Sequence, residues 1–290
     1  MSERFSHVLN VISEQARFLA EEMRDIGAAV WLRDDYAFDI AFTGDPAKIL
    51  GQARSLAYGS AADINVVPVG NRRKKLLIAD MDSTIITCEC LDELADMAGL
   101  KPQIAAITER AMRGEIEFGA ALRQRVAMLN GLALEALERT WRERVRLNPG
   151  VLALVATMKK NGARACLVSG GFTYFTERMA GLAGFDDHRA NMLQDDGKFL
   201  TGAVREPILG RAAKLATLED EVAQLGLSFD DALCVGDGAN DLDMIRRAGL
   251  GVAYHAKPVV AEAAAARIDH GDLRALLYLQ GYRDAEIAGN

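Results

Sequence analysis

The spacing of apolar and polar residues divides this chain into two parts of different character. Over residues 1–72, apolar side chains first recur at helical intervals and then form shorter, strand-like runs. The predicted order is helix, strand, strand, helix, strand, over residues 9–23, 28–32, 36–42, a helix that begins after Pro46, and 63–69. Such an order indicates a small α+β domain.

Residues 73–290 contain short apolar runs that alternate with helix patterns, which predicts an α/β fold. We expect a Rossmann-like, doubly wound parallel sheet with ligands at the carboxyl ends of its strands. Residues at about 91–148 lack strand signals and are expected to form an inserted helical cap. The basic segment 71–75 between the two parts is interpreted as a solvated linker. The predicted strands are 76–79, 163–168, 232–235 and 251–254, the predicted helices are 173–182, 211–225 and two beginning near 241 and 258, and a hairpin is expected over 192–199.

Composition and charge narrow the class of protein. Of the 290 residues, 50% are hydrophobic, which is ample for a packed core. The net charge of −7 argues against binding nucleic acid, because that function depends on an excess of Lys and Arg. No run approaches the roughly 18 apolar residues of a membrane helix, and the 4 cysteines do not suggest a disulfide framework. We therefore expect a cytoplasmic enzyme with neither a nucleic acid nor a membrane as its partner.

Carboxylates follow two of the predicted strands directly. Asp80 and Asp82 come after strand 76–79, and Asp237 and Asp241 follow strand 232–235. Each pair alone could be an ordinary turn or helix cap. Because both strand ends should lie at one edge of the same sheet, however, four carboxylates would converge there and repel one another. A hard cation such as Mg²⁺ would resolve that repulsion.

Two further features suggest an anion site. Ser169, Gly170 and Gly171 follow a third strand and precede a helix, so they would offer a hydroxyl and open backbone N–H groups. Lys214 lies near the start of the helix over 211–225 and would be a point charge for phosphate oxygens. Either feature alone is weak, because glycine-rich turns and solvated lysines are common.

In their order along the chain, these residues resemble the haloacid dehalogenase superfamily of phosphohydrolases, and the helical insert resembles the cap of that superfamily. Further residues resemble the substrate pocket of one subfamily, the phosphoserine phosphatases. Residues 1–72 are loosely similar to the ACT-like regulatory or dimerisation domain of bacterial members. The matching positions are Asp80, Asp82, Ser83, Thr84, Ser169, Lys214, Gly236, Asp237, Asn240 and Asp241 for the four superfamily motifs, and Glu89, Met112, Phe118 and residues 122–126 for the subfamily.

The resemblance implies a role for each of these residues. Asp80 would attack phosphorus and form an aspartyl-phosphate, and Asp82 would act as general acid and then as base. Mg²⁺ would be held by Asp80, the backbone carbonyl of Asp82, and Asp237, with Asp241 supporting the ion from further out. The groups that would bind or orient the phosphate are Ser169, Gly170, Gly171, Lys214 and Asn240.

The resemblance also implies the substrate, O-phospho-L-serine, and thereby the last step of serine biosynthesis. Glu89 would bind the ammonium group and Arg125 the carboxylate, whereas Met112 and Phe118 would exclude water. Two alternatives stay open. One is a related phosphatase or phosphotransferase for another small phosphorylated amine or alcohol, and the other is an amino-acid-sensing regulator with a vestigial phosphatase core. A homodimer and the ligand of residues 1–72 also stay open.

Overall fold

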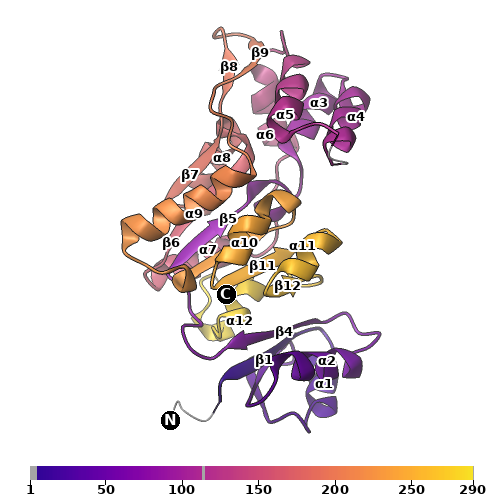
Figure 1. Cartoon of the computed structure of the whole chain (residues 1–290), viewed down its shortest axis with the longest axis vertical. Coiled ribbons are helices and arrows are strands. Elements are labelled where there is room, and N and C mark those ends of the chain that lie inside the picture. The colour runs from indigo at the N-terminus through magenta and orange to yellow at the C-terminus, as the bar shows by residue number, and fades with distance from the viewer. Residues whose placement is uncertain (1–4, 113–114, 290) are drawn as a thin grey trace.

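The computed structural model describes residues 5–112 and 115–289, without the side chain of Met112. Three parts follow one another along its long axis: the N-terminal unit, the central sheet with its helices, and the cap (Figure 1). Among the helices of these described residues, none is long and apolar enough to cross a membrane.

The N-terminal unit is an antiparallel sheet in the order β2-β3-β1-β4, packed against two helices. The predicted helix over 9–23 is wrong in its first part, because residues 7–12 form a strand. This strand is buried on both faces: Leu9 and Val11 pack with the unit's own helices, whereas Val8 and Ile12 join the core of the central domain. Burial on both faces removes the alternation that marks a strand. The elements are β1 (His7–Ile12), α1 (Ala16–Glu22), β2 (Ala29–Arg33), β3 (Ala37–Phe42), α2 (Pro46–Leu56) and β4 (Asp63–Pro68).

The central domain is a six-stranded parallel sheet in the order β12-β11-β10-β5-β6-β7, which confirms the predicted fold class. Its two faces bury separate apolar clusters, one beneath α7, α8 and α12 and the other beneath α9, α10 and α11. The edge strands β7 and β12 were not predicted, because one is largely polar and the other has only 3 residues. The strands are β5 (Leu76–Ala79), β6 (Arg164–Phe172), β7 (Asp187–Asn191), β10 (Ala232–Gly236), β11 (Leu250–Tyr254) and β12 (Ala266–Ile268), and the helices are α7 (Val151–Lys160), α8 (Thr173–Ala183), α9 (Arg211–Leu225), α10 (Leu242–Arg247), α11 (Pro258–Ala263) and α12 (Ala275–Leu279).

The cap consists of the helical insert together with the predicted hairpin. Backbone bonds join the two: Gly131 donates to the carbonyl of Leu200, and Leu200 donates to that of Leu132. Through these bonds the hairpin ties the cap to the central domain at a second place (Figure 1). Within the insert, the chain turns between residues 127 and 135, which separates helix α5 from helix α6. The elements are α3 (Cys90–Met97), α4 (Lys101–Met112), α5 (Phe118–Ala127), α6 (Glu135–Glu143), β8 (Leu193–Asp195) and β9 (Leu200–Val204).

The interpretation of segment 71–75 as a solvated linker is wrong for Arg72 and Lys74, although the other three residues are exposed. Arg72 forms a two-pronged ion pair with Asp39 of β3, and the side chains are only 14% and 11% exposed. Its guanidinium also donates to the backbone carbonyls of Tyr278 and Leu279. On the same interface, Asn65 of β4 exchanges two hydrogen bonds with the backbone of Arg267. The N-terminal unit is thus fastened to the C-terminal end of the central domain.

Candidate active site

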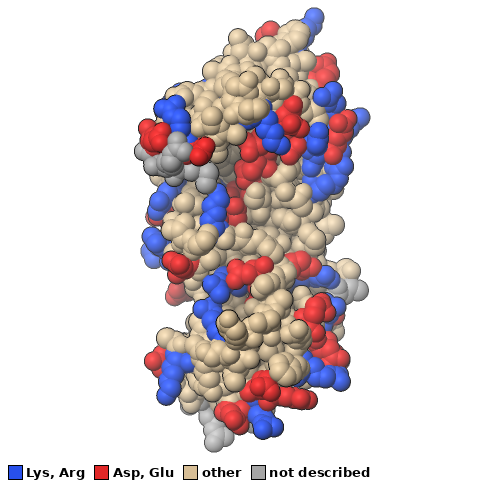
Figure 2. All heavy atoms as spheres, turned by 90° about the vertical axis from the view of Figure 1, so that its right-hand side faces the viewer, with Lys and Arg blue, Asp and Glu red and all other residues tan. Residues whose placement is uncertain are grey.

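The carboxyl ends of β5, β6 and β10 meet beneath the cap around a cavity of about 580 Å³. Acidic side chains gather where the surface between the cap and the central domain is hollowed (Figure 2). The cavity brings together most of the residues singled out from the sequence. Lining it are Asp80, Asp82, Glu89, Phe118, Arg125, Ser169, Gly170, Gly171, Asp237 and Asn240.

Lys214 and Asp241 lie behind Asp80 and are fully buried. The Nζ atom of Lys214 is 2.7 Å from Oδ1 of Asp80 and 2.6 Å from Oδ1 of Asp241. Burial opposes the charged ammonium, but the carboxylates of Asp241 and Asp80 outweigh it and raise the pKa of Lys214. Burial, followed by the charge of Asp241, raises the pKa of Asp80 well above its usual value. The lysine therefore holds the Asp80 carboxylate in place and offsets part of the local negative charge.

Asp82 lies next to Asp80 on the loop that follows β5. Its Oδ2 accepts a 2.9 Å hydrogen bond from the hydroxyl of Ser169, and its Oδ1 accepts one of 2.9 Å from the N–H of Cys90. Burial raises the pKa of Asp82, and these two donors partly oppose that rise. A carboxyl group held in this way is suited to keep a proton and to deliver it to a leaving group.

The carboxylates of Asp80, Asp237 and Asp241, here called the carboxylate cluster, place one oxygen each within 4.8 Å of one another. Asp237 receives a 3.3 Å hydrogen bond from the hydroxyl of Thr84, and burial together with the charge of Asp241 raises its pKa. Three buried or half-buried carboxylates with oxygen donors only are a chemically suitable set for a hard divalent cation. The cluster could therefore hold such an ion.

A second group of metal-ligand types, Cys166, Asp187 and Glu221, has a different environment. Arg164 lies 2.6 Å from Glu221, and Arg189 lies 3.2 Å from it. Because these arginines already neutralise the Glu221 carboxylate, we interpret this group as an ion-pair network that joins β7 and α9 to β6.

Residues 169–171, here called the phosphate loop, depend on glycine. A Cβ atom on Gly171 would lie 2.8 Å from Oδ2 of Asp82 and 3.0 Å from Oγ of Ser169. A Cβ atom on Gly170 would lie 3.2 Å from the ring of Phe118. The loop can therefore approach both the Asp82 carboxylate and Phe118 of the cap only because these two side chains are absent.

At the cap end of the cavity, Glu89 and Arg125 provide charges of opposite sign. Glu89 is open to the cavity, yet the atoms around it and the charge of Asp82 raise its pKa to about 7. Burial lowers the pKa of Arg125, whose Nη1 lies 3.3 Å from the hydroxyl of Thr108. The side chain of Met112 lies outside the described part of the structure, so its predicted role stays a prediction.

Several residues that line the cavity were not singled out from the sequence. Asp92 and Thr108 stand beside Arg125, and Lys257 stands beside Asp237, whose carbonyl accepts a 3.2 Å hydrogen bond from the Lys257 N–H. Asp92 lies one helical turn after Glu89, a spacing that could have indicated a shared face. Nothing in the sequence near Lys257 indicates its position, because it depends on how β11 lies beside β10.

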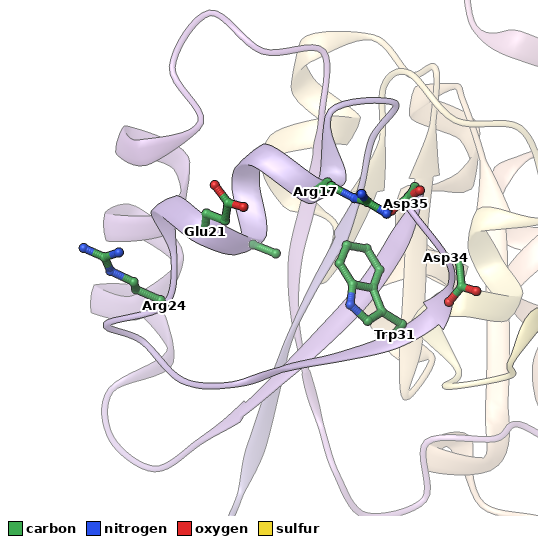
Figure 3. Close-up of a pocket in the computed structure, with 7 residues that line it drawn as sticks. Arg17, Glu21, Arg24, Trp31, Asp34 and Asp35 are labelled. Atoms are coloured by element: carbon green, nitrogen blue, oxygen red, sulfur yellow. Dashed lines mark hydrogen bonds and ion pairs between the residues drawn. The ribbon is translucent and has the colours of Figure 1, made fainter.

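A second, open hollow lies on the N-terminal unit between α1 and the β2–β3 turn (Figure 3). Trp31 forms one wall, and Arg17 reaches across to Asp35 at 2.6 Å. The charged side chains of that pair are 73% and 57% exposed. This hollow has no buried charged group, unlike the cavity beneath the cap, so the cavity beneath the cap is the better candidate for chemistry.

The parallel sheet, the inserted cap and the carboxylates at the strand ends define a class of phosphate-transferring hydrolase. The sequence profile of the haloacid dehalogenase-like hydrolases matches residues 77–246, and the chain belongs to this family.

Within that family, several of the similar proteins are named phosphoserine phosphatases. A phosphoserine phosphatase from Polaromonas sp. is 49% identical over 210 residues, which cover 71% of this chain and 89% of the relative. The crystal structure of a probable phosphoserine phosphatase from Vibrio cholerae superposes with a TM-score of 0.81 at 29% identity, covering 98% of this chain and 88% of that one. A substrate-bound phosphoserine phosphatase complex superposes with a TM-score of 0.66 at 36% identity, covering 71% and 97%. The resemblance to this group, inferred from the sequence, is confirmed.

Proposed function

We propose that this protein hydrolyses O-phospho-L-serine to L-serine and phosphate with the help of Mg²⁺. The observation that carries the proposal is that one cavity joins two kinds of binding group. Asp80 and the phosphate loop lie at one end, and Glu89 and Arg125 lie at the other. A phosphorylated amino acid needs both ends, because its phosphate, ammonium and carboxylate must all be matched. The similar proteins named phosphoserine phosphatase support the same substrate.

In the proposed reaction, Asp80 attacks phosphorus and forms an aspartyl-phosphate, while Asp82 gives its proton to the serine oxygen that leaves. Asp82 then takes a proton from the water that attacks the aspartyl-phosphate. The Gly170 N–H binds a phosphoryl oxygen, the Ser169 hydroxyl holds the Asp82 carboxyl, and Asn240 orients the phosphoryl group. Arg125 binds the substrate carboxylate through a bidentate pair of hydrogen bonds, Glu89 binds the ammonium, and Phe118 excludes water.

The metal would be held by Asp80, the backbone carbonyl of Asp82, and Asp237, with Asp241 supporting it. When bound, it supplies positive charge that offsets the phosphoryl oxygens and the crowded carboxylates. Lys214 keeps the Asp80 carboxylate in place from the side opposite the cavity. We further propose a cytoplasmic enzyme that acts at the last step of serine biosynthesis. Its four cysteines are all free, as the reducing cytoplasm would keep them.

A panel of three phosphate esters tests the substrate. Phosphoethanolamine lacks the carboxylate, and 3-phosphoglycerate has a hydroxyl in place of the ammonium. We expect phosphate release from O-phospho-L-serine to exceed that from both by at least tenfold in kcat/KM. Turnover should stop with a chelator and return with added Mg²⁺. The Asp80→Asn variant should fold and show no turnover. Equal kcat/KM of the wild-type enzyme for all three esters would contradict the assignment of the cap residues to substrate binding.

A further inference from the structure

The phosphate loop is a bulge in the central sheet. β6 and β7 pair regularly up to Val168, and pairing resumes only at Phe172. Between these points β6 contributes the three residues of the loop, whereas β7 contributes Ala190 alone. Extra residues on one strand leave ladder groups without partners and re-aim the chain, as is frequent beside active sites. The bulge therefore needs another element to fix its peptide groups.

The side chain of Asn191 fills this gap. Its Nδ2 donates to the carbonyl of Gly170 at 2.9 Å and to the carbonyl of Leu209 at 3.0 Å. Its Oδ1 accepts a 2.7 Å hydrogen bond from the N–H of Leu209. The residue is only 2% exposed, so these three bonds replace contacts with water. Two carbonyl acceptors and one N–H donor also determine which end of the amide faces which partner.

A continuous chain of hydrogen bonds leads from this amide to the catalytic carboxyl. The carbonyl of Gly170 and the N–H of Gly171 belong to one planar peptide group, so fixing the first fixes the second. The Gly171 N–H donates to Oγ of Ser169 at 2.8 Å. Since that oxygen already accepts this bond, its proton is directed to Oδ2 of Asp82, 2.9 Å away.

The second arm of Asn191 reaches the lysine helix. Leu209, which it binds twice, directly precedes Gly210, and a Cβ atom there would lie 3.0 Å from the ring of Phe118. The N–H of Lys214 donates to the carbonyl of Gly210 at the start of α9. One buried amide thus connects the phosphate loop with the segment that places Phe118 and Lys214.

We propose that Asn191 is a positioning residue for phosphoryl transfer, which sets the direction of the Ser169 hydroxyl and the N–H groups of the phosphate loop. This inference rests on the proposed phosphatase function, although Asn191 itself does not line the cavity. Removing the amide should lower kcat about 10- to 100-fold, because oriented donors act mainly in the transition state. KM for O-phospho-L-serine should rise no more than about tenfold, because Glu89 and Arg125 on the cap keep their contacts with the ammonium and carboxylate of the substrate.

Three variants test this role. Asn191→Ala removes the amide, and Asn191→Asp keeps its shape but loses both N–H donors. Asn65→Ala is the matched control, because Asn65 is also 2% exposed and also exchanges two backbone hydrogen bonds, but on the distant interface with Arg267. All three should lose thermal stability, whereas only the Asn191 variants should lose kcat. An equal loss of kcat in Asn65→Ala, or unchanged kcat in a folded Asn191 variant, would overturn the proposal.

A double-mutant cycle with Ser169→Ala separates positioning from general weakening. If Asn191 acts through the Ser169 hydroxyl, adding Asn191→Ala to the Ser169→Ala variant should lower kcat less than threefold further. If the two substitutions instead lower kcat by independent factors that multiply in the double variant, Asn191 does not act through that hydroxyl.

Binding of inorganic phosphate in the presence of Mg²⁺, followed by calorimetry, provides a readout independent of the substrate. It should weaken about tenfold in Asn191→Ala and stay unchanged in Asn65→Ala, and equal affinity in Asn191→Ala and wild type would contradict the proposal. A wild-type enzyme that binds phosphate but does not hydrolyse O-phospho-L-serine would instead refute only the proposed substrate.

Discussion

The hydroxyl of Ser83 donates a 2.7 Å hydrogen bond to Oε1 of Glu89, and this bond joins the loop that follows β5 to the start of the cap. Ser83 has a φ of 57°, which is uncommon for a residue with a side chain. Glu89 stands immediately before α3, as its N-cap residue. The bond therefore fixes the direction of the carboxylate that is proposed to meet the ammonium group of the substrate.

Ser83→Ala should weaken binding of the ammonium end of the substrate. Hydrogen bonds to charged groups contribute about 1.5–3 kcal/mol, which corresponds to roughly tenfold or more in affinity. We expect KM for O-phospho-L-serine and for phosphoethanolamine to rise about tenfold, with kcat lowered less than threefold. Initial rates over a range of substrate concentrations measure both. KM for p-nitrophenyl phosphate, which has no ammonium group, should not change, and a comparable rise there would show a general disturbance of the loop that follows β5.

The raised pKa of Glu89 predicts a pH dependence of substrate binding. Because burial and the charge of Asp82 raise that pKa to about 7, the side chain loses its negative charge as the pH falls below 7. KM for O-phospho-L-serine should therefore rise from pH 8 to pH 6, relative to KM for p-nitrophenyl phosphate. The Glu89→Gln variant, which has no charge to lose, should show a high KM ratio that does not vary with pH. A ratio independent of pH in the wild type would contradict this prediction.

Removal of divalent metal should make stability fall as the pH rises. Burial raises the pKa values of Asp80, Asp82 and Asp237, and the charge of Asp241 adds to the rise for Asp80 and Asp237. When an acid has a higher pKa in the folded state than in the unfolded state, the unfolded chain releases its proton at a lower pH. The free energy of unfolding therefore decreases as the pH rises above about 4.

In a chelator, Tm should therefore be lower at pH 8 than at pH 5.5. A saturating cation binds only the folded state, and at 100 times its Kd it adds about 2.7 kcal/mol. Adding Mg²⁺ should raise Tm at pH 8 by several degrees in a thermal-shift assay. In Asp237→Asn, the chelated protein should be more stable than chelated wild type, and the gain from Mg²⁺ should largely disappear. An equal gain in both proteins would place the ion elsewhere.

The ion pair of Arg72 with Asp39 predicts a strong link between the N-terminal unit and the central domain. Arg72→Ala leaves a nearly buried carboxylate without its cation, which typically costs about 3–5 kcal/mol. Arg73→Ala is the natural comparison, because its pair with Glu286 is 43% and 41% exposed and such pairs contribute about 0–1 kcal/mol. Urea unfolding of the two variants should separate them by at least about 2 kcal/mol. Equal midpoints would mean that the interface does not depend on this pair.

The sequence predicted the fold most reliably where one local signal decides the structure. The helix over 211–225 was predicted with the limits that the structure shows, because its apolar spacing is regular and Gly226 follows as a left-handed cap. The strand His7–Ile12 was missed, because contact with the central domain buries its outer face. That contact joins residues more than 260 positions apart, as Asn10 and Tyr278 show, and no local pattern records it.

The residues of the candidate site, too, could be predicted only where a sequence pattern or a general rule of sheet geometry places them. The strand-end carboxylates could be placed together, because parallel strands put their carboxyl ends at one edge. Asn191 could not be found in this way, since its role arises from a bulge in the neighbouring strand. Arg72 was misjudged for a related reason: a run of basic residues is usually solvated, and only the folded interface shows that the Arg72 side chain is 14% exposed and paired with Asp39.

The close approach of the phosphate loop to Asp82 predicts that Gly171 cannot be replaced without loss of activity. In Gly171→Ala, the new Cβ would lie 2.8 Å from Oδ2 of Asp82 and 3.0 Å from Oγ of Ser169, so the bond between these two residues must lengthen or break. We expect kcat to fall at least tenfold, which corresponds to about 1.4 kcal/mol in the barrier. Gly181→Ala is the matched control: it lies within α8, and nothing is within 4 Å of its Cβ position. There kcat should stay unchanged and Tm should rise slightly, because Ala favours a helix over Gly by about 0.5–1 kcal/mol. Full activity in a folded Gly171→Ala protein would show that the hydrogen bond from Ser169 to Asp82 is not needed for turnover.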